Sequence, residues 1–423
     1  MALSTKSFAI SKREVFEAWK CVKANRGAAG IDGQSIASFE ANLSSNLYKL
    51  WNRLASGSYF PPAVKAVEIP KQLGGKRQLG IPTVSDRIAQ TVVKQRLELE
   101  LEPYFDKDSY GYRPGKSALQ AVRVTQDRCW NQDWVVEFDI KGAFDNLDHA
   151  LLKTALRKHT ACRWVLLYID RWLTVPTQNS DGEVSERTIG TPQGGVIGPL
   201  LMNVFMHYAF DKWMRRKINC EFARFADDAV IHCRSQKQAE WVVEMLQERF
   251  AQCGLELNHD KTRIVYCCDS KRSRCKSYPN ISFTFLGFTF RPRRARRRSD
   301  GGLFTRFLAA ASNEACKRMR QRIRKWRIPR QAPAPMEEFS EFYNPILRGW
   351  WNYYGKFYPS IVLSKVFRHF DLTLALWARR KFKRFIRHKR RSLQAIDRFA
   401  RRHPNMFVHW SIWHRNGLIV GAV

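Results

Sequence analysis

The segment FARFADDAVIHC occupies residues 222–233 and places two adjacent aspartates, Asp227 and Asp228, between two short runs of strand-forming residues. Apolar and β-branched residues on both sides of a polar pair predict a strand, a tight turn and a second strand. Paired Asp residues are also common in ordinary hairpin turns. By itself, the segment therefore predicts a hairpin and leaves the role of the carboxylates open.

A second acidic segment, WVVEFDIKGAFD, lies about 88 residues earlier, at 134–145. Residues 134–140 read as a strand, and alternation with period two puts Glu137 and Asp139 on the same face. We expect a helix immediately behind this strand. Asp139 could simply cap that helix, so this segment too has a purely structural interpretation.

Taken together, the two segments predict that Asp139, Asp227 and Asp228 meet in space. Three neighbouring carboxylates repel one another, and a divalent cation would hold them together. Hard oxygen ligands favour Mg²⁺ or Mn²⁺ over softer metals. Two such ions could activate a 3′-hydroxyl and stabilise a leaving pyrophosphate, which indicates phosphoryl transfer.

The charge of the chain indicates a polyanionic partner. The sequence has 423 residues and a formal net charge of +35, and residues 291–423 alone hold 32 Lys and Arg against 7 Asp and Glu. Aromatic residues lie among these charges, which favours nucleic acid over a solvated basic surface or a membrane surface. There is no signal-peptide core and no apolar stretch of membrane-spanning length, so we expect a cytoplasmic protein with no membrane partner.

The remaining patterns predict an α+β fold. Helices are expected at 11–25, 39–54, 86–101 and 200–213, and a hairpin at 64–82 with its turn at Gly74-Gly75. Strands and helices do not alternate regularly, which favours a sheet with helices on one side over a doubly wound sheet. After Arg291 the strand signals fade, and the rest is expected to be helical and basic. The run RRKFKRFIRHKRR at 379–391 is expected to form a basic helix that binds nucleic acid.

The order of motifs resembles that of the reverse transcriptases encoded by bacterial group II introns, over essentially the whole chain. The motifs that carry the resemblance are KRQLGIP (76–82), YGYRPGKS (110–117), FDIKGAF (138–144), GTPQGGVIGPL (190–200), FADD (225–228), GLELNHDKT (254–262), FLGF (285–288) and LRGWWNYY (347–354). Phe225 stands where most of the family has Tyr, which leaves metal binding intact.

The resemblance implies a right-hand polymerase fold. Residues 1–60 would extend the fingers, 61–290 would form fingers and palm with an antiparallel palm sheet, 291–375 a helical thumb or maturase domain, and 376–423 a basic DNA-binding region. Many family members continue into an HNH endonuclease domain. The sequence ends at Val423 without one, so we expect the compact class.

The resemblance also implies residue roles. The backbone carbonyl of Ile140 would join the three aspartates as a metal ligand. Phe144 would be a steric gate against ribonucleotides, although a core phenylalanine is the simpler interpretation of the residue itself. The incoming dNTP would be contacted by Lys76, Arg77, Phe144, Gln193 and Lys261, and the primer would be gripped by Leu286, Gly287 and Phe288.

Nucleic-acid contacts are expected from two further groups of residues. In the fingers and thumb motifs these are Arg113, Arg348, Trp350, Trp351, Tyr353 and Tyr354; in the basic run they are Arg379, Arg380, Lys381, Lys383, Arg384 and Arg387. A helix core rich in Trp and Tyr explains the aromatic members equally well.

The predicted function is RNA-directed DNA synthesis from a primer with dNTPs and two Mg²⁺ ions, together with binding of intron RNA for splicing and retrohoming. The expected partners are intron RNA or another RNA template and a DNA primer or target, at a bacterial nucleoid. Two alternatives are a standalone reverse transcriptase recruited to DNA repair or phage defence, and a splicing maturase without polymerase activity. The second alternative predicts loss of the carboxylates, which are present.

Overall fold

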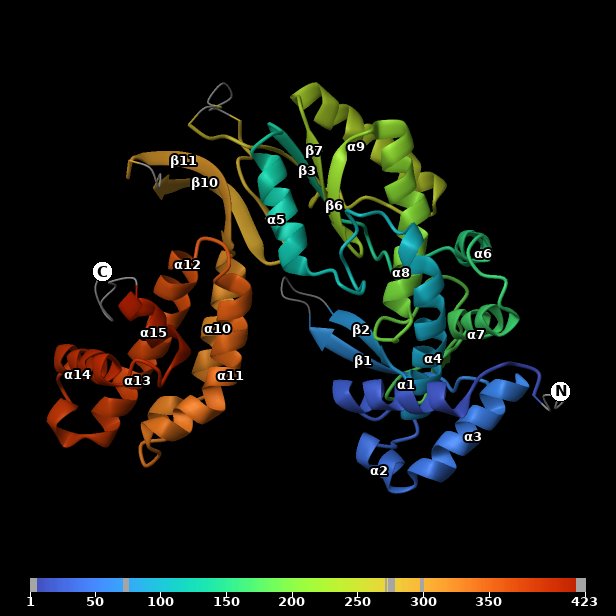
Figure 1. Cartoon of the computed structure of the whole chain (residues 1–423), viewed down its shortest axis with the longest axis horizontal. Helices are drawn as coiled ribbons and strands as arrows, with labels where there is room; N and C mark the ends of the chain where they lie inside the picture. Colours follow the sequence, from blue (N-terminus) through green and yellow to red (C-terminus); the bar gives the residue numbers. More distant parts are fainter. Residues whose placement is uncertain (1–5, 71–75, 271, 273–277, 297–299, 416–423) are drawn as a thin grey trace. The chain divides into compact units, whose positions relative to one another are not determined.

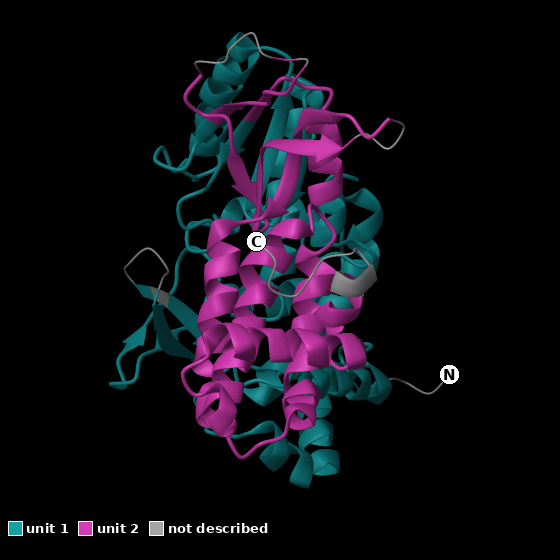
Figure 2. Ribbon diagram, turned by 90° about the vertical axis from the view of Figure 1, so that its left-hand side faces the viewer, with its two compact units in different colours: residues 1–121, 136–263 teal, residues 122–135, 264–423 magenta. Residues whose placement is uncertain are grey.

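The computed structural model describes residues 6–70, 76–270, 272, 278–296 and 300–415. The chain forms two compact units, coloured separately in Figure 2. Unit 1 comprises residues 1–121 and 136–263, and unit 2 comprises residues 122–135 and 264–423. The four-part division inferred from the sequence stays a prediction.

Unit 1 begins with three helices, α1 (Lys12–Asn25), α2 (Ile36–Ala41) and α3 (Leu43–Ser56). A capping box starts α1, where Ser11 and Glu14 each bond the other's backbone N–H. The single helix predicted for 39–54 is wrong, because Asn42 leaves the helical region at φ −122° and separates α2 from α3. Gly57, at φ +79°, ends α3.

A small sheet in unit 1 has the strand order β2-β1-β4-β5. Its hairpin pairs β1 (Val64–Pro70) with β2 (Lys76–Ile81) in antiparallel register, and β1 also pairs in parallel with β4 (Thr177–Gln178), which pairs with β5 (Val184–Ser185). The hairpin is as predicted, whereas its turn at Gly74-Gly75 lies outside the described residues.

The sheet that carries the acidic segments has the strand order β6-β7-β3-β8. Its strands are β3 (Trp134–Phe138), β6 (Glu221–Phe225), β7 (Asp228–Cys233) and β8 (Arg263–Tyr266). Because β7 and β3 are neighbours, the turn between β6 and β7 lies beside the end of β3. The two acidic segments are therefore adjacent in space.

The helix expected immediately after β3 is absent from that position. Residues 141–146 form turns instead, with Gly142 at φ +51°, and α6 (His149–Arg157) begins only after Asp148 caps it through the N–H of Leu151. The turn keeps Phe144 and Asp145 close to the end of the strand.

Helices cover one face of the acidic sheet, as Figure 1 shows for α8 (Gly198–Met206) and α9 (Gln236–Gln252). The helix that starts at α8 continues through two π-helical segments, η2 (His207–Asp211) and η3 (Met214–Ile218), beyond the predicted end at 213. Phe210 packs against Phe138 and Phe222 of the sheet, and Phe250 of α9 joins them. The predicted α+β class with helices on one side is confirmed.

Helix α4 (Val84–Leu101) crosses unit 1 with buried polar residues at its start. Asp86 accepts hydrogen bonds from Tyr59 Oη at 2.9 Å, Trp172 Nε1 at 2.7 Å and Gln90 Nε2 at 2.9 Å. Burial raises the pKa of Asp86 to about 6, although these donors oppose the rise. Trp172 lies on α7 (Arg163–Leu173), so Asp86 joins two helices and the segment before β1.

Gln90 extends this network to the loop that follows β5. Its Oε1 accepts the backbone N–H groups of Val196 at 2.7 Å and Ile197 at 3.2 Å. The side chain of Gln90 is buried and supplies both N–H groups with an acceptor inside unit 1. The glycine-rich loop is thereby fixed to the interior of unit 1.

Unit 2 contains a sheet that the sequence did not predict. Strands β9 (Phe283–Phe285), β10 (Phe288–Arg296) and β11 (Leu303–Ala311) pair in the order β11-β10-β9. The stacked rings of Phe283, Phe290 and Phe307 form its core. Arg293 is tolerated in β10 because its guanidinium bonds the carbonyls of Thr289 and Leu308.

The rest of unit 2 is helical, as predicted, and most of its α-helices surround one apolar core. The helices around this core are α10 (Asn313–Lys325), α11 (Met336–Tyr354), α12 (Ser360–Val362), α13 (Arg368–Lys381), α14 (Lys389–Arg402) and α15 (Val408–Arg415). Helix α5 (Ala118–Cys129) belongs to unit 2 from Val122 onward, and its Gln126 accepts a hydrogen bond from the N–H of Ala309 in β11. The continuous basic helix predicted for 379–391 is wrong, because Phe382 is extended at φ −113° and ψ 116°. The break separates like charges that one helix would place four residues apart, and it lets Phe385 enter the core.

Within the described ranges, no helix is both long enough and apolar enough to cross a lipid bilayer.

The role of Gln90 can be tested by replacing it with leucine. Gln90→Leu strands two buried N–H groups and removes a donor from Asp86, so we expect the free energy of unfolding to fall by about 1–3 kcal/mol per unsatisfied group. Amide hydrogen exchange of peptides containing 194–198 should accelerate. The matched control is Gln95→Leu on the same helix, whose side-chain amide donates to Cys21 Sγ at 3.6 Å near the surface. Equal exchange in both variants would contradict the assignment.

Candidate active site

The candidate catalytic carboxylates lie in unit 1, at the end of β3 and at the β6–β7 hairpin. Asp139 follows β3, Asp227 lies in the turn, and Asp228 is the first residue of β7. Glu137 lies two residues before Asp139 on the same strand. All four carboxylates come from neighbouring strands of one sheet, as the sequence predicted for the three aspartates.

The electrostatics of Asp228 show how closely these groups are crowded. Its pKa is raised to about 8, first by burial and then by the negative charges of Asp227, Glu137 and Asp139, while Lys261 lowers it. Burial makes the largest contribution, and the three neighbouring carboxylates add a negative potential at the site. Such a site attracts cations.

Lys261 and Asn258 hold Asp139 from the segment after α9. The Lys261 ammonium lies 2.8 Å from Asp139 Oδ2, and Asn258 Nδ2 donates to the same oxygen at 3.3 Å. The backbone N–H of Asn258 donates to the carbonyl of Asp139 at 2.8 Å. The next residue, Ile140, forms an isolated antiparallel β-bridge with Leu257. Because the side chain of Lys261 is 55% exposed, its ammonium can leave Asp139 at little cost.

The carboxylates at the end of β3 and at the β6–β7 hairpin offer oxygen donors to a metal ion. Across the described residues, no three His, Cys, Asp or Glu side chains are arranged to hold a metal ion. The chemistry of the residues nevertheless fits a hard divalent cation, because the carboxylates offer only oxygen donors, and burial together with their mutual repulsion raises the pKa of Asp228. A cation would replace the ammonium of Lys261 at Asp139.

Arg224, whose side chain has no exposed surface, stabilises the β6–β7 turn from the interior of unit 1. Its guanidinium forms a bidentate ion pair with Asp211, at 2.6 and 2.7 Å. It also donates to the carbonyl of Ala226 at 2.8 Å and to Asn203 Oδ1 at 3.0 Å. Ala226 has φ +59°, a left-handed conformation that costs a non-glycine residue about 1–2 kcal/mol. Arg224 therefore stabilises the strained residue directly before Asp227.

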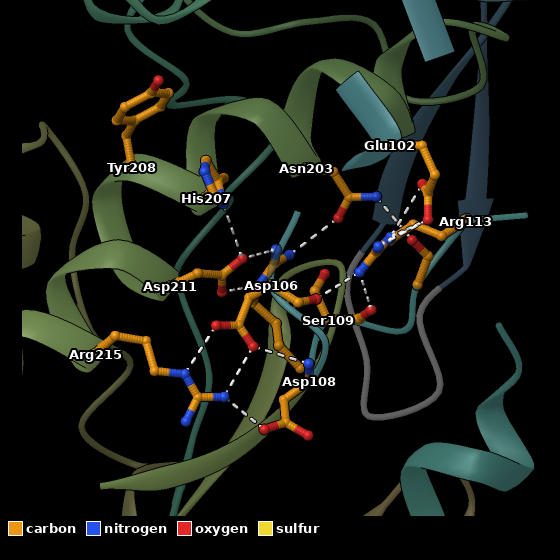
Figure 3. Close-up of polar contacts among 12 residues, drawn as sticks. Glu102, Asp106, Asp108, Ser109, Arg113, Asn203, His207, Tyr208, Asp211 and Arg215 are labelled. Carbon is orange, nitrogen blue, oxygen red and sulfur yellow. Dashed lines mark hydrogen bonds and ion pairs between the residues drawn. The ribbon is translucent and has the colours of Figure 1, made fainter. Parts of the chain in front are cut away.

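Residues 108–111 form hydrogen bonds with residues beside the same turn. Tyr110 N–H donates to the carbonyl of Arg224 at 2.8 Å, and Asn203 Nδ2 donates to the carbonyl of Gly111 at 2.7 Å. A Cβ at Gly111 would lie 2.4 Å from the nitrogen of Ala226, so only glycine fits. Figure 3 shows this polar network around Asn203 and Asp211.

Arg113 has a structural role that differs from the predicted nucleic-acid contact. Its side chain is only 5% exposed and pairs with Glu102, with Nη2 to Oε1 at 2.7 Å. It also donates to the carbonyls of Asp106 and Ser109, as Figure 3 shows. With its donors used inside unit 1, Arg113 is not presented to a ligand, and that prediction is corrected.

Some of the residues predicted to contact a nucleotide lie close together. Gln193 Nε2 donates to Asp145 Oδ2 at 2.9 Å, next to the half-buried Phe144. Thr191 N–H donates to the carbonyl of Phe144 at 2.8 Å, and a Cβ at Gly190 would lie 2.3 Å from the carbonyl oxygen of Asp145. The glycine loop therefore fixes the turn after β3, and both border the acidic cluster.

The same loop contacts the hairpin that carries Lys76 and Arg77. Gly80 N–H donates to the carbonyl of Gln193 at 2.7 Å. Lys76 is exposed and pairs with Glu68 across the hairpin. Arg77 lies in β2 opposite Ile69, and its side chain lies outside the described residues.

In unit 2, the predicted primer-grip residues form the turn from β9 to β10. Leu286 and Gly287 have φ of +51° and +79°. The hydroxyl of Tyr353 donates to the carbonyl of Leu286 at 2.9 Å. Phe288 is fully buried against Tyr353, Tyr354 and Phe357, so its ring packs in the protein core. Leu286 and Gly287 of the turn are partly exposed.

The aromatic residues of 347–354 also pack within unit 2. Trp350 stacks on Trp326 at 5.7 Å, and Trp351 lies against Phe367. Arg348 is exposed on the same helix. The helix-core interpretation therefore accounts for Trp350, Trp351, Tyr353 and Tyr354, and Arg348 stays a predicted contact.

The basic run divides into anchored and exposed residues. Arg379, Arg380 and Lys381 donate to the carbonyls of Ile386, Pro329 and Ala334, respectively. Lys383, Arg384 and Arg387 are exposed, and so is Arg380. Arg379, Arg380 and Lys381 have these structural partners, so Lys383, Arg384 and Arg387 remain the stronger candidates for phosphate contact.

Sequence reasoning missed several residues of the candidate active site. Glu137 could have been included, because period two placed it beside Asp139. Asn258 belongs to a quoted motif but received no role. Arg224, Asn203 and Asp211 gave no signal, since a buried ion pair between residues 13 positions apart is not a local pattern.

Models of known protein families match parts of this chain. Residues 69–290 match the family model described as reverse transcriptase (RNA-dependent DNA polymerase), and residues 316–394 match the maturase-specific domain of group II introns. Protein YkfC of Escherichia coli is 29% identical over 325 residues, covering 66% of this chain and 81% of the relative. Group II intron-encoded protein LtrA of Lactococcus lactis is 25% identical over 433 residues, covering 80% and 68%.

Among solved structures, a telomerase from Candida albicans with a fragment of telomeric RNA is similar at a TM-score of 0.46 and 13% identity. That similarity covers 89% of this chain and 67% of the telomerase chain.

The supporting role of Arg224 predicts a separation of stability from turnover. Arg224→Met leaves Asp211 buried and unpaired, which should cost about 3–5 kcal/mol of unfolding free energy. The double variant Arg224→Met/Asp211→Leu removes both charges and should recover most of that loss. Its kcat for primer extension should stay at least about tenfold below wild type, since the carbonyl of Ala226 still lacks its donor.

In that double variant the KM for dNTP should change by less than about threefold, because the nucleotide contacts are elsewhere. Recovery of kcat together with stability would show that Arg224 serves folding alone.

Proposed function

Because the chain belongs to the reverse transcriptase (RNA-dependent DNA polymerase) family, we propose that Asp139, Asp227 and Asp228 are its catalytic carboxylates and hold two Mg²⁺ ions. The family and the maturase-specific domain confirm the predicted resemblance to group II intron-encoded reverse transcriptases. The function is RNA-directed DNA synthesis joined to intron splicing and mobility. The observation that carries the site proposal is the crowding of Asp228 by Asp227, Glu137 and Asp139.

The carboxylates and the carbonyl of Ile140 would be the metal ligands. When bound, the ions would lower the pKa of the primer 3′-hydroxyl and stabilise charge on the leaving pyrophosphate. Lys261, released from Asp139, has a mobile ammonium that can neutralise or protonate the pyrophosphate. Mn²⁺ has the same preference for oxygen ligands and should support synthesis.

The nucleotide would bind between the turn after β3 and the glycine-rich loop. Phe144 would exclude a 2′-hydroxyl, and Gln193 would orient the base pair while Asp145 holds its amide. Lys76 and Arg77 would contact the triphosphate from the hairpin, since Gly80 links that hairpin to Gln193. The glycines allow the backbone to approach the substrate closely.

The nucleic-acid partners follow from the same family. An RNA template would be read in unit 1, and a DNA primer would meet the turn at Leu286 and Gly287. Intron RNA would use the maturase-specific domain, where exposed Arg348, Lys383 and Arg387 supply positive charge. Binding spread over many cations should fall steeply as salt is raised.

Removal of one carboxylate tests the catalytic assignment. Asp227→Asn should lower kcat for primer extension with dNTPs and Mg²⁺ by roughly 10³-fold or more, because a charged ligand is lost at constant shape. Binding of intron RNA should change by less than about threefold, since it rests on many Lys and Arg. Asp181→Asn, on an exposed loop, is the matched control and should leave both properties unchanged. Parallel loss of synthesis and RNA binding would contradict separate roles.

Phe144 provides a test of sugar selection. Phe144→Ala opens space beside the nucleotide and should raise the ratio of rNTP to dNTP incorporation by about 10–100-fold. Phe144→Tyr keeps the ring and should retain the wild-type ratio. Competition between labelled rNTP and dNTP on one primer–template measures the ratio. If the alanine and tyrosine variants discriminate equally well, Phe144 is a packing residue only.

A further inference from the structure

A basic pocket opens in unit 1 beside the π-helical segments that follow α8. Its volume is about 390 Å³, and it is lined by Lys158, Tyr208, Lys212, Trp213, Arg216, Lys217 and Arg249. Five of these seven residues are cationic: Lys158 caps the end of α6, Lys212 lies between η2 and η3, Arg216 and Lys217 lie in η3, and Arg249 lies in α9. The lining contains no acidic side chain.

The positive charges of the pocket are not neutralised by the protein. In the described part of the chain, no carboxylate lies within ion-pair distance of Lys158, Lys212, Arg216 or Lys217. The ammonium groups of Lys158 and Lys212 instead lie over the same ring, 4.9 and 4.7 Å from the centre of Tyr208. Burial, Arg216 and Lys158 together lower the pKa of Lys212. The cluster is thus poised to take an anion.

The pocket is built on fixed groups. Arg249 donates to the carbonyls of Tyr208 and Ala209, each at 3.0 Å, which holds its guanidinium against the helix. The hydroxyl of Tyr208 shares a hydrogen bond of 2.8 Å with His159 Nε2, which holds the ring. The aromatic ring and one cation are therefore positioned before any ligand arrives.

This pocket faces away from the carboxylate site. The opposite side of the same helix carries Phe210, which packs on the sheet, and Asp211, which pairs with Arg224. Figure 3 shows Tyr208 pointing away from the network around Asp211 and Arg215. A ligand in the basic pocket would not reach Asp227 along this side of the helix.

An apolar slot adjoins the basic pocket and shares Lys158, Tyr208 and Arg249 with it. Its volume is about 140 Å³, and its other walls are Leu151, Thr154, Ala155, Phe205, Ala209 and Cys253. A slot of this size beside an aromatic ring suits one flat ring system, and the adjoining cations suit phosphate. An acidic peptide would satisfy the cations but leave the slot empty.

We propose that this pocket and slot bind an unpaired nucleotide of an RNA strand, with its base in the slot and its flanking phosphates on Lys158, Lys212 and Arg216. Bases of single-stranded RNA are free to enter such slots, whereas bases in a duplex are not. The site is separate from the polymerase centre and independent of the metal and gate assignments. It would hold template or intron RNA on the helix-covered side of the acidic sheet.

The test uses the full chain and a short oligouridylate that carries one 4-thiouridine. After irradiation, crosslinks are mapped by mass spectrometry with a protease that does not cleave at lysine. We expect a crosslink within 205–217 that competes with unlabelled single-stranded RNA but resists the same RNA in a duplex. Lys158→Glu/Lys212→Glu should reduce this crosslink at least tenfold and leave crosslinks elsewhere within twofold.

The matched control is Lys49→Glu/Lys237→Glu, which changes the same charge at exposed sites of unit 1 and should leave the crosslink intact. Retained kcat on a saturating primer–template shows that the pocket variant is folded, and Lys158→Gln/Lys212→Gln serves if charge reversal unfolds the chain. An oligomer with an abasic site in place of the neighbouring uridine should bind more weakly. Equal loss in the pocket and control variants, no crosslink in 205–217, or equal displacement by polyglutamate would overturn the proposal.

Discussion

Arg224 and Asp211 form an ion pair without exposed surface, and the geometry of the carboxylate site depends on it. The guanidinium reaches past its partner to the carbonyl of Ala226 and so fixes a left-handed residue directly before the acidic turn. Two buried charges would destabilise unit 1 if either lacked its partner. The protein thus holds its most strongly repelling groups on a turn whose backbone is stabilised from the interior.

The glycine-rich loop at 190–198 is the second organising feature of unit 1. Gln90 binds it from α4, Gly80 from the hairpin and Phe144 from the turn after β3. Elements far apart in the sequence therefore share one rigid connection beside the carboxylates. A rigid connection of this kind suits a site that must orient a substrate to within a fraction of an ångström.

Much of this arrangement could be predicted from local patterns. The hairpin at 222–233 and the strand before Asp139 follow from alternation and turn residues, and the order of motifs predicted the family. The β10–β11 hairpin could not be predicted, because Arg and Pro obscure its alternation and the stacking of Phe283, Phe290 and Phe307 is a tertiary effect. The break at Phe382 was missed for a related reason, since charge repulsion and burial of Phe385 override helix propensity. Arg113 was misassigned because a sequence does not show which arginines are already paired within the protein.

The two π-helical segments after α8 restrict how this helix can change by insertion or deletion. A π turn contains more residues than an α turn, so losing its extra residue would leave a regular α-helix whose flanking turns keep their orientation. Within the segment, however, one position would be missing, so Phe210 and Asp211 could not keep facing the sheet while Tyr208 and Lys212 kept facing the pocket. Substitutions on the outer surface can be accommodated one at a time, but the length of this segment is constrained by both of its faces at once.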